Sequence, residues 1–134
     1  MSPKIEELLP LSETLNSESN ELNKTITAIN EKLAALNFGI AVSIKGRATW
    51  FGYAKVLTGP GKSSWELAYD ADEWSVEVDE HGRMAASPTP LLKGSRDIRI
   101  EGLGLVPKIV ARLKAEAEHR IRIMRDAKTL AAEL

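Results

Sequence analysis

Residues 11–37 read LSETLNSESNELNKTITAINEKLAALN, and this stretch decides the fold. From Leu15 onward, positions spaced three and four residues apart are large aliphatics except at Ser19. The apolar members of this series are Leu15, Leu22, Ile26, Ile29, Leu33 and Leu36. This is the spacing of the a and d positions of a heptad repeat, which places the side chains in one narrow stripe on a helix. The stretch therefore predicts a long helix that packs through this stripe.

Three partners could cover the stripe: a second copy of the chain, the sheet of the same chain, or a different protein. The flanking positions are mostly polar, which keeps the stripe narrow: Asn16, Glu18, Asn20, Asn23, Lys24, Asn30 and Glu31. A helix that lies on its own sheet usually has a wider apolar face. We therefore predict a homo-oligomer, most simply a dimer, whose interface is formed by Leu15, Leu22, Ile26, Ile29, Leu33 and Leu36.

Both ends of this helix carry local signals. A proline inside a helix removes a hydrogen bond and clashes with the preceding turn, so Pro10 predicts a break or kink after a short N-terminal turn. Ser12 and Glu13 then start the long helix. Asn37 predicts its end, because asparagine adopts the left-handed conformation that closes many helices.

After Asn37 the apolar period changes to two, which predicts strands. The segments 38–44 and 49–57 form the first two. The second is central because it is apolar on both sides, with Phe51 and Tyr53 on one side and Trp50 on the other. Glycine, proline and serine predict a loop over 58–64. A third strand carries Trp65, Leu67 and Tyr69, a fourth carries Trp74, Val76 and Val78, and a short return strand covers 83–86. Residues 38–86 thus form a four- to five-stranded antiparallel meander.

The C-terminal third is helical after a linker. The pair Pro88 and Pro90 predicts a linker over 87–94, because proline fits poorly inside a ladder or a helix. Residues 98–105 alternate like a strand, but Ser95 is a helix cap, and we favour a short helix. Pro107 fits the first turn of a long final helix. The whole chain, 1–134, is predicted to be a single α+β domain with the C-terminal helices (95–134) packed on one sheet face.

An aromatic cluster in the predicted sheet offers an alternative function. All seven aromatic residues lie between Phe38 and Trp74. Trp50, Phe51 and Tyr53 are close to Lys55 in the second strand, and exposed aromatics beside cations stack nucleic-acid bases or flat small molecules. The competing interpretation, which we favour, is that these rings fill the core.

Charge and composition restrict the remaining functions. The net charge of −1 gives no general attraction to nucleic acid or to an anionic membrane, so we expect neither as a partner. The chain has no cysteine and only two histidines, and no spacing typical of a metal site or a catalytic motif. Acidic residues gather in 65–82 and basic residues in 91–128, a segregation typical of solvated faces. We expect no cofactor and no enzymatic activity.

The expected localisation rests on two sequence features that we do not find. The first residues show no apolar core of a signal peptide, and no run approaches the length of a membrane span. We therefore expect a cytoplasmic protein. The sequence favours a non-enzymatic homo-oligomeric interaction or adaptor module, with a ligand-binding module as the alternative.

Overall fold

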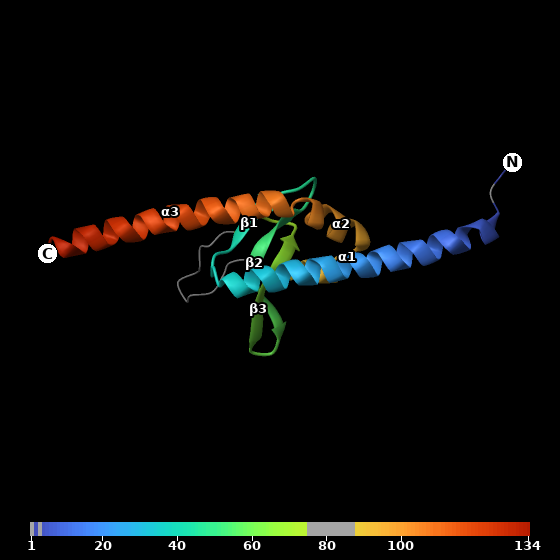
Figure 1. Ribbon diagram of the computed structural model, residues 1–134, viewed down its shortest axis with the longest axis horizontal. Helices are drawn as coiled ribbons and strands as arrows, with labels where there is room; N and C mark the ends of the chain where they lie inside the picture. The colour runs from blue at the N-terminus through green and yellow to red at the C-terminus, as the bar shows by residue number, and fades with distance from the viewer. Residues whose placement is uncertain (1, 3, 75–87) are drawn as a thin grey trace.

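The computed structural model describes residue 2, residues 4–74 and residues 88–134. Two long helices flank a small antiparallel sheet, with a short helix beside them (Figure 1), so the predicted α+β class is confirmed. The elements are η1 (Ile5–Glu7), α1 (Leu8–Leu36), β1 (Val42–Lys45), β2 (Trp50–Gly59), β3 (Lys62–Asp70), β4 (Thr89–Pro90), η2 (Leu91–Lys93), α2 (Arg96–Gly104) and α3 (Val106–Ala132).

Helix α1 has its predicted end but not its predicted start. Asn37 takes the left-handed conformation, with φ 52° and ψ 45°, and its N–H donates to the carbonyl of Ala34. The break expected at Pro10 is wrong, because α1 begins at Leu8 and runs through Pro10. Pro10 therefore lies in the first turn, where backbone N–H groups have no partner within the helix and a missing N–H costs little.

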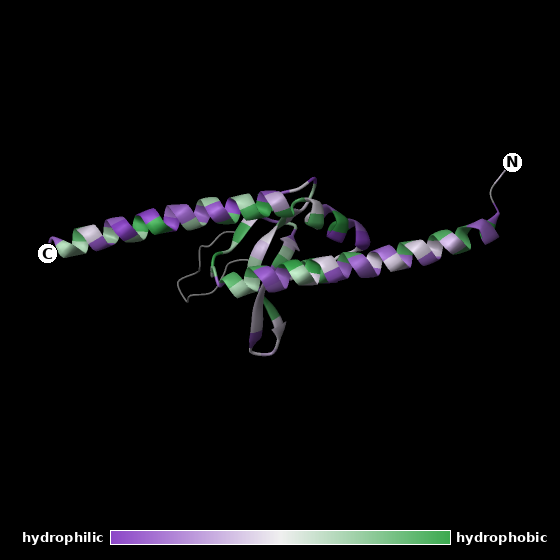
Figure 2. Ribbon diagram, viewed as in Figure 1, coloured by the Kyte–Doolittle hydropathy of each residue, from purple (hydrophilic) through white to green (hydrophobic). Residues whose placement is uncertain are grey.

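The outer parts of α1 and α3 project beyond the sheet in opposite directions, and the two chain ends lie at opposite ends of the molecule (Figure 1). Every residue in 5–18 and every residue in 118–134 is exposed. We call these two segments the α1 arm (5–18) and the α3 arm (118–134). Hydrophobic positions recur along both arms (Figure 2).

The sheet has the strand order β1-β2-β3-β4 with antiparallel neighbours, and β2 is central as predicted. The loop expected over 58–64 is wrong. The β2–β3 hairpin extends to Gly59 and Lys62, so only Pro60 and Gly61 form the turn. Gly61 has φ 70°, a left-handed value that favours glycine. Composition suggested a loop here, but cross-strand pairing extends the strands through these polar residues.

The predicted linker contains the fourth strand. Thr89 and Pro90 form β4 and pair with Tyr69 and Ala68 of β3, which corrects the linker expected over 87–94. Among the described strands β4 lies at the edge of the sheet. Proline is tolerated there because one side of the backbone of an edge strand needs no ladder partner. The strands expected at 74–78 and at 83–86 lie outside the described residues, except for Trp74.

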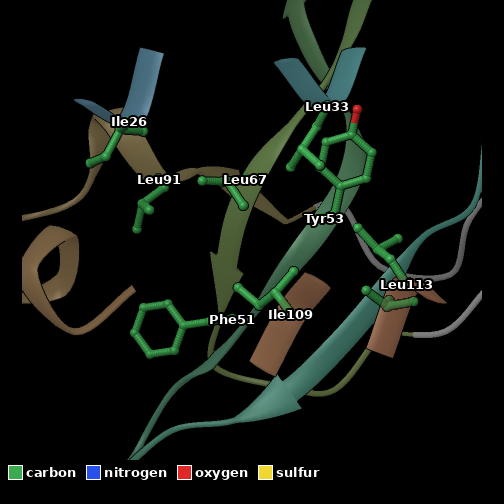
Figure 3. Packing of buried hydrophobic residues seen from close by; sticks show 9 residues of the cluster. Ile26, Leu33, Phe51, Tyr53, Leu67, Leu91, Ile109 and Leu113 are labelled. Atoms are coloured by element: carbon green, nitrogen blue, oxygen red, sulfur yellow. The ribbon is translucent and has the colours of Figure 1, made fainter. Parts of the chain in front are cut away.

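The main core lies between the sheet and the two long helices (Figure 3). α1 packs on the β3 side of the sheet and α3 on the β1 side. Side chains of both α2 and α3 belong to or pack against this one core, so the prediction that the C-terminal helices pack on one sheet face is confirmed. The buried members of this core are Ile26, Leu33, Val42, Phe51, Tyr53, Leu67, Leu91, Ile109 and Leu113.

The opposite sheet face is covered around Trp74. This side chain is 3% exposed and packs with Ala41, which directly precedes β1, with Ala54 and Val56 of β2, and with Ala68 of β3. The indole Nε1–H donates to the carbonyl of Tyr53 over 3.4 Å, and the Ser43 hydroxyl donates to the carbonyl of Trp74 over 2.6 Å. Both sheet faces are therefore part of the packed interior.

Helix α2 confirms the helical interpretation of residues 98–105. The Ser95 hydroxyl oxygen accepts a hydrogen bond from the Ile98 N–H over 3.2 Å, as an N-cap does. α2 sits so close to the core that a Cβ on Gly102 would lie 2.6 Å from a methyl carbon of Leu91. Glycine at this position thus sets how closely the helix approaches.

Candidate interaction surface

The structure divides the predicted heptad stripe of α1 into a buried half and an exposed half. Ile26 and Leu33 are buried in the protein's own core, and Leu22 and Ile29 are half-buried against it. Leu15 is 51% exposed and Leu36 is 62% exposed. Four of the six residues expected at an oligomer interface therefore pack within the same chain, and only the two ends of the series are open.

The open part of the stripe continues toward the N-terminus. Leu8, Leu11 and Leu15 are spaced three and four residues apart and are 54%, 60% and 51% exposed. At 100° per residue they lie on the same side of α1 as Ile26 and Leu33. Helix α1 extends beyond the sheet, which covers only the C-terminal part of the stripe. We call Leu8, Leu11 and Leu15 the α1 stripe; Leu8 and Leu11 extend the sequence-based prediction beyond Leu15.

A groove between α1 and α2 extends the α1 stripe into the body of the molecule. It has a volume of about 350 Å³ and mostly apolar walls. Its lining includes the apolar side chains of Leu15, Leu22, Ile100 and Leu103 and the charged side chains of Glu18, Glu21 and Arg96. Among the described residues, the hydroxyl oxygen of Ser19 is shielded here without a hydrogen-bond partner.

A second groove opens between the end of α1 and α3. Its volume is about 330 Å³ and its walls are almost entirely apolar. It is lined by Leu33, Leu36, Phe38, Val110, Leu113, Lys114, Ala117 and Glu118. Leu36, which the sequence assigned to the interface, thus borders an open apolar groove.

The second groove leads onto the α3 arm. Ile121 is 41% exposed and Met124 is 54% exposed. With Val110 and Ala117 they follow intervals of seven, four and three residues, so they share one side of the helix. We call Val110, Ala117, Ile121 and Met124 the α3 stripe. The sequence-based interface omitted this helix, although the same heptad spacing was present there.

The residues of the alternative ligand face are not brought together on an open surface. Phe51 and Tyr53 are each 1% exposed within the main core, and Tyr53 stacks on Trp65 with ring centres 5.6 Å apart. Trp50 is half-buried on the opposite sheet face, and only Lys55 is exposed. Burial also raises the pKa of the Tyr53 hydroxyl, with a smaller contribution from the charge of Glu66.

The arms also differ in charge. The α1 arm carries Glu6, Glu7, Glu13 and Glu18 and no lysine or arginine. The α3 arm carries four cations, Arg120, Arg122, Arg125 and Lys128, against the three acids Glu118, Asp126 and Glu133. Glu118 already lies 3.7 Å from Lys114 of the same helix. The α1 arm is therefore acidic, and the middle of the α3 arm is basic.

The described residues contain no candidate metal site, and comparisons identify no relative of the chain. Within the described residues, no three histidine or carboxylate side chains come together as a metal site would require. No helix in that part of the chain is both long and apolar enough to cross a membrane. Comparisons with protein-family models, curated proteins and solved structures found no significant match.

Proposed function

We propose that the protein is a non-enzymatic interaction module that assembles with itself, most simply as a dimer, through the exposed part of α1. The observation that carries this proposal is the α1 stripe, in which Leu8, Leu11 and Leu15 are all at least half exposed on one side of a helix. The same side of α1 packs a core where the sheet is present. Beyond the sheet it has the pattern of a packing surface without a covering element.

Burial of this stripe would release considerable free energy. A fully buried leucine side chain contributes about 1.5–3 kcal/mol relative to an exposed one. Contiguous exposed apolar patches on soluble proteins are typical of interaction sites. The exposed walls of the two grooves are mostly apolar, which suits the packing of another helix better than the transfer of a proton or a chemical group.

The ligand-binding alternative has less support. Stacking on Phe51 or Tyr53 would require the core to open, because both rings are almost fully buried. The half-buried Trp50 lies on the opposite sheet face from these two rings. We therefore retain self-assembly as the leading proposal.

Native mass spectrometry of the purified protein, followed by measurement of its denatured mass, tests the proposal. A dimer mass is expected, and the double variant Leu11→Glu with Leu15→Glu should shift it to the monomer. Leu9→Glu is the matched control, because Leu9 is 64% exposed on the same arm but lies outside the stripe. Ile26 is unsuitable, since it is 0% exposed and its replacement would test folding. A wild-type monomer at micromolar concentration would overturn the proposal.

A further inference from the structure

We infer that the α1 arm of one copy packs along the α3 arm of a second copy, with the α1 stripe facing the α3 stripe. This inference rests on the proposed self-assembly and specifies its partner surface. It differs from the pairing suggested by the sequence alone, in which the stripe of α1 would meet the same stripe of its partner. The lengths of the two arms, their positions on the molecule and their charges each support this pairing.

The two arms match in length. The helical part of the α1 arm, residues 8–18, is about 16 Å long, and η1 extends it toward the N-terminus. The helical part of the α3 arm, 118–132, is about 22 Å long at the same rise per residue. The α3 arm is therefore long enough to cover the α1 stripe. The α1 arm is long enough to cover Ile121 and Met124, the two members of the α3 stripe that lie on the α3 arm.

The positions of the arms allow both to be covered at once. They leave the body in opposite directions (Figure 1). A twofold rotation about an axis perpendicular to the long dimension exchanges these directions. It places the α1 arm of the second copy on the side of the α3 arm of the first, and the reverse contact follows by symmetry. In a closed dimer with two equivalent arm contacts, each of the four arms is covered by an arm of the other copy.

Charge selects this pairing over that of like arms. Two α1 arms side by side would bring together eight glutamates without a lysine or arginine. An α3 arm instead supplies Arg120, Arg122, Arg125 and Lys128. Opposite charges beside an apolar seam determine the choice of partner in paired helices, whereas like charges oppose it.

Specific charges border the two stripes. At 100° per residue, Glu18 lies along one margin of the α1 stripe. Glu7 directly precedes Leu8 as the last residue of η1, and its carboxylate accepts a hydrogen bond from the Lys4 N–H over 3.0 Å. Arg120 precedes Ile121 and Arg125 follows Met124, and these two arginines lie on either margin of the α3 stripe. Glu13 and Arg122 lie on the far sides of their helices. The chain thus provides both the charges to reverse and matched controls.

The test is a charge exchange between the arms, measured as the dimer dissociation constant by sedimentation at low salt. One variant carries Glu7→Arg and Glu18→Arg, and the other carries Arg120→Glu and Arg125→Glu. Each alone is expected to weaken the homodimer at least about tenfold, since each creates like-charge contacts. An equimolar mixture should form a heterodimer of near wild-type affinity, because both arm contacts are then complementary. The controls Glu13→Arg and Arg122→Glu should change the constant less than about threefold.

The outcomes separate the pairing of the arms from self-assembly itself. Circular dichroism of each variant confirms that it remains folded. A wild-type dimer that tolerates reversal of Arg120 and Arg125 would overturn the α1–α3 pairing while leaving self-assembly intact. A wild-type monomer would overturn both.

Discussion

Asn30 of α1 accepts a hydrogen bond from the backbone N–H of Leu67 in β3, with 2.8 Å between Oδ1 and N. Asn30 is only 8% exposed. Strand β4 pairs with Ala68 and Tyr69 and does not extend to Leu67. The amide of Asn30 therefore satisfies a backbone donor at the edge of the sheet and fastens the long helix to it.

Replacement of Asn30 by alanine should destabilise the fold by about 1–3 kcal/mol, because it leaves the buried N–H of Leu67 without an acceptor. Urea unfolding measures this free energy. Asn20→Ala is the matched control, since Asn20 is exposed on the same helix and its replacement brings the same gain in helix propensity. Equal free energies of unfolding for the two variants would contradict the structural role of Asn30.

The sequence predicted the long helix and its end but not the role of this asparagine. Periodicity placed Ile26 and Leu33 on one stripe and assigned Asn30 to the polar flank. From the sequence pattern alone, a polar residue beside an apolar stripe is predicted to be exposed to solvent. Its partner lies 37 residues away on a strand, and only tertiary structure shows that this strand has an unpaired edge donor. For the same reason, heptad spacing alone did not distinguish the part of the stripe under the sheet from the part beyond it.

Gly102→Ala should destabilise the protein by about 1–3 kcal/mol through overpacking, despite the better helix propensity of alanine. The added Cβ would lie 2.6 Å and 2.9 Å from the two methyl carbons of Leu91 and 3.1 Å from a ring carbon of Phe51. Thermal unfolding followed by circular dichroism provides the measurement.

Gly104→Ala in the same helix is the control, because nothing lies within 4 Å of the position of its Cβ. This variant should be neutral or slightly more stable, by up to about 1 kcal/mol. If both glycine variants change stability alike, close packing against Leu91 is not what requires Gly102.

The edge strand β4 shows a second limit of sequence interpretation. Pro88 and Pro90 argued against a ladder, and that argument holds for a central strand. The sequence does not reveal that residues 89–90 lie at an edge, where the ladder needs only one side of the backbone. The aromatic cluster was similar: alternation correctly separated Trp50 from Phe51 and Tyr53, but which faces are covered depends on how the helices and Trp74 pack.

Addition of a single-stranded oligonucleotide such as oligo(dT) should leave the tryptophan emission unchanged at low salt. Trp74 is 3% exposed, Trp65 is stacked on the buried Tyr53, and the net charge of −1 offers little attraction to phosphates. Fluorescence titration tests this, with free N-acetyltryptophanamide as the control for light absorption by the oligonucleotide. Quenching that saturates and is reversed by salt would instead support the ligand-binding alternative.

Alkaline pH should destabilise the fold through Tyr53. Burial raises the pKa of its hydroxyl above the ordinary value of 10.0, and Glu66 adds a smaller effect in the same direction. Above about pH 10 the unfolded chain loses this proton while the folded protein retains it, so the unfolded state binds fewer protons and stability falls as pH rises. This stabilising contribution is fully present below pH 10. It is lost as the pH rises from about 10 through the raised pKa of the folded state. Tyr53→Phe keeps the ring that stacks on Trp65 but removes the titrating group. The free energy of unfolding in urea, measured at pH 8 and at pH 11, should therefore fall less for this variant than for the wild type, and parallel losses would show that other groups cause the decline.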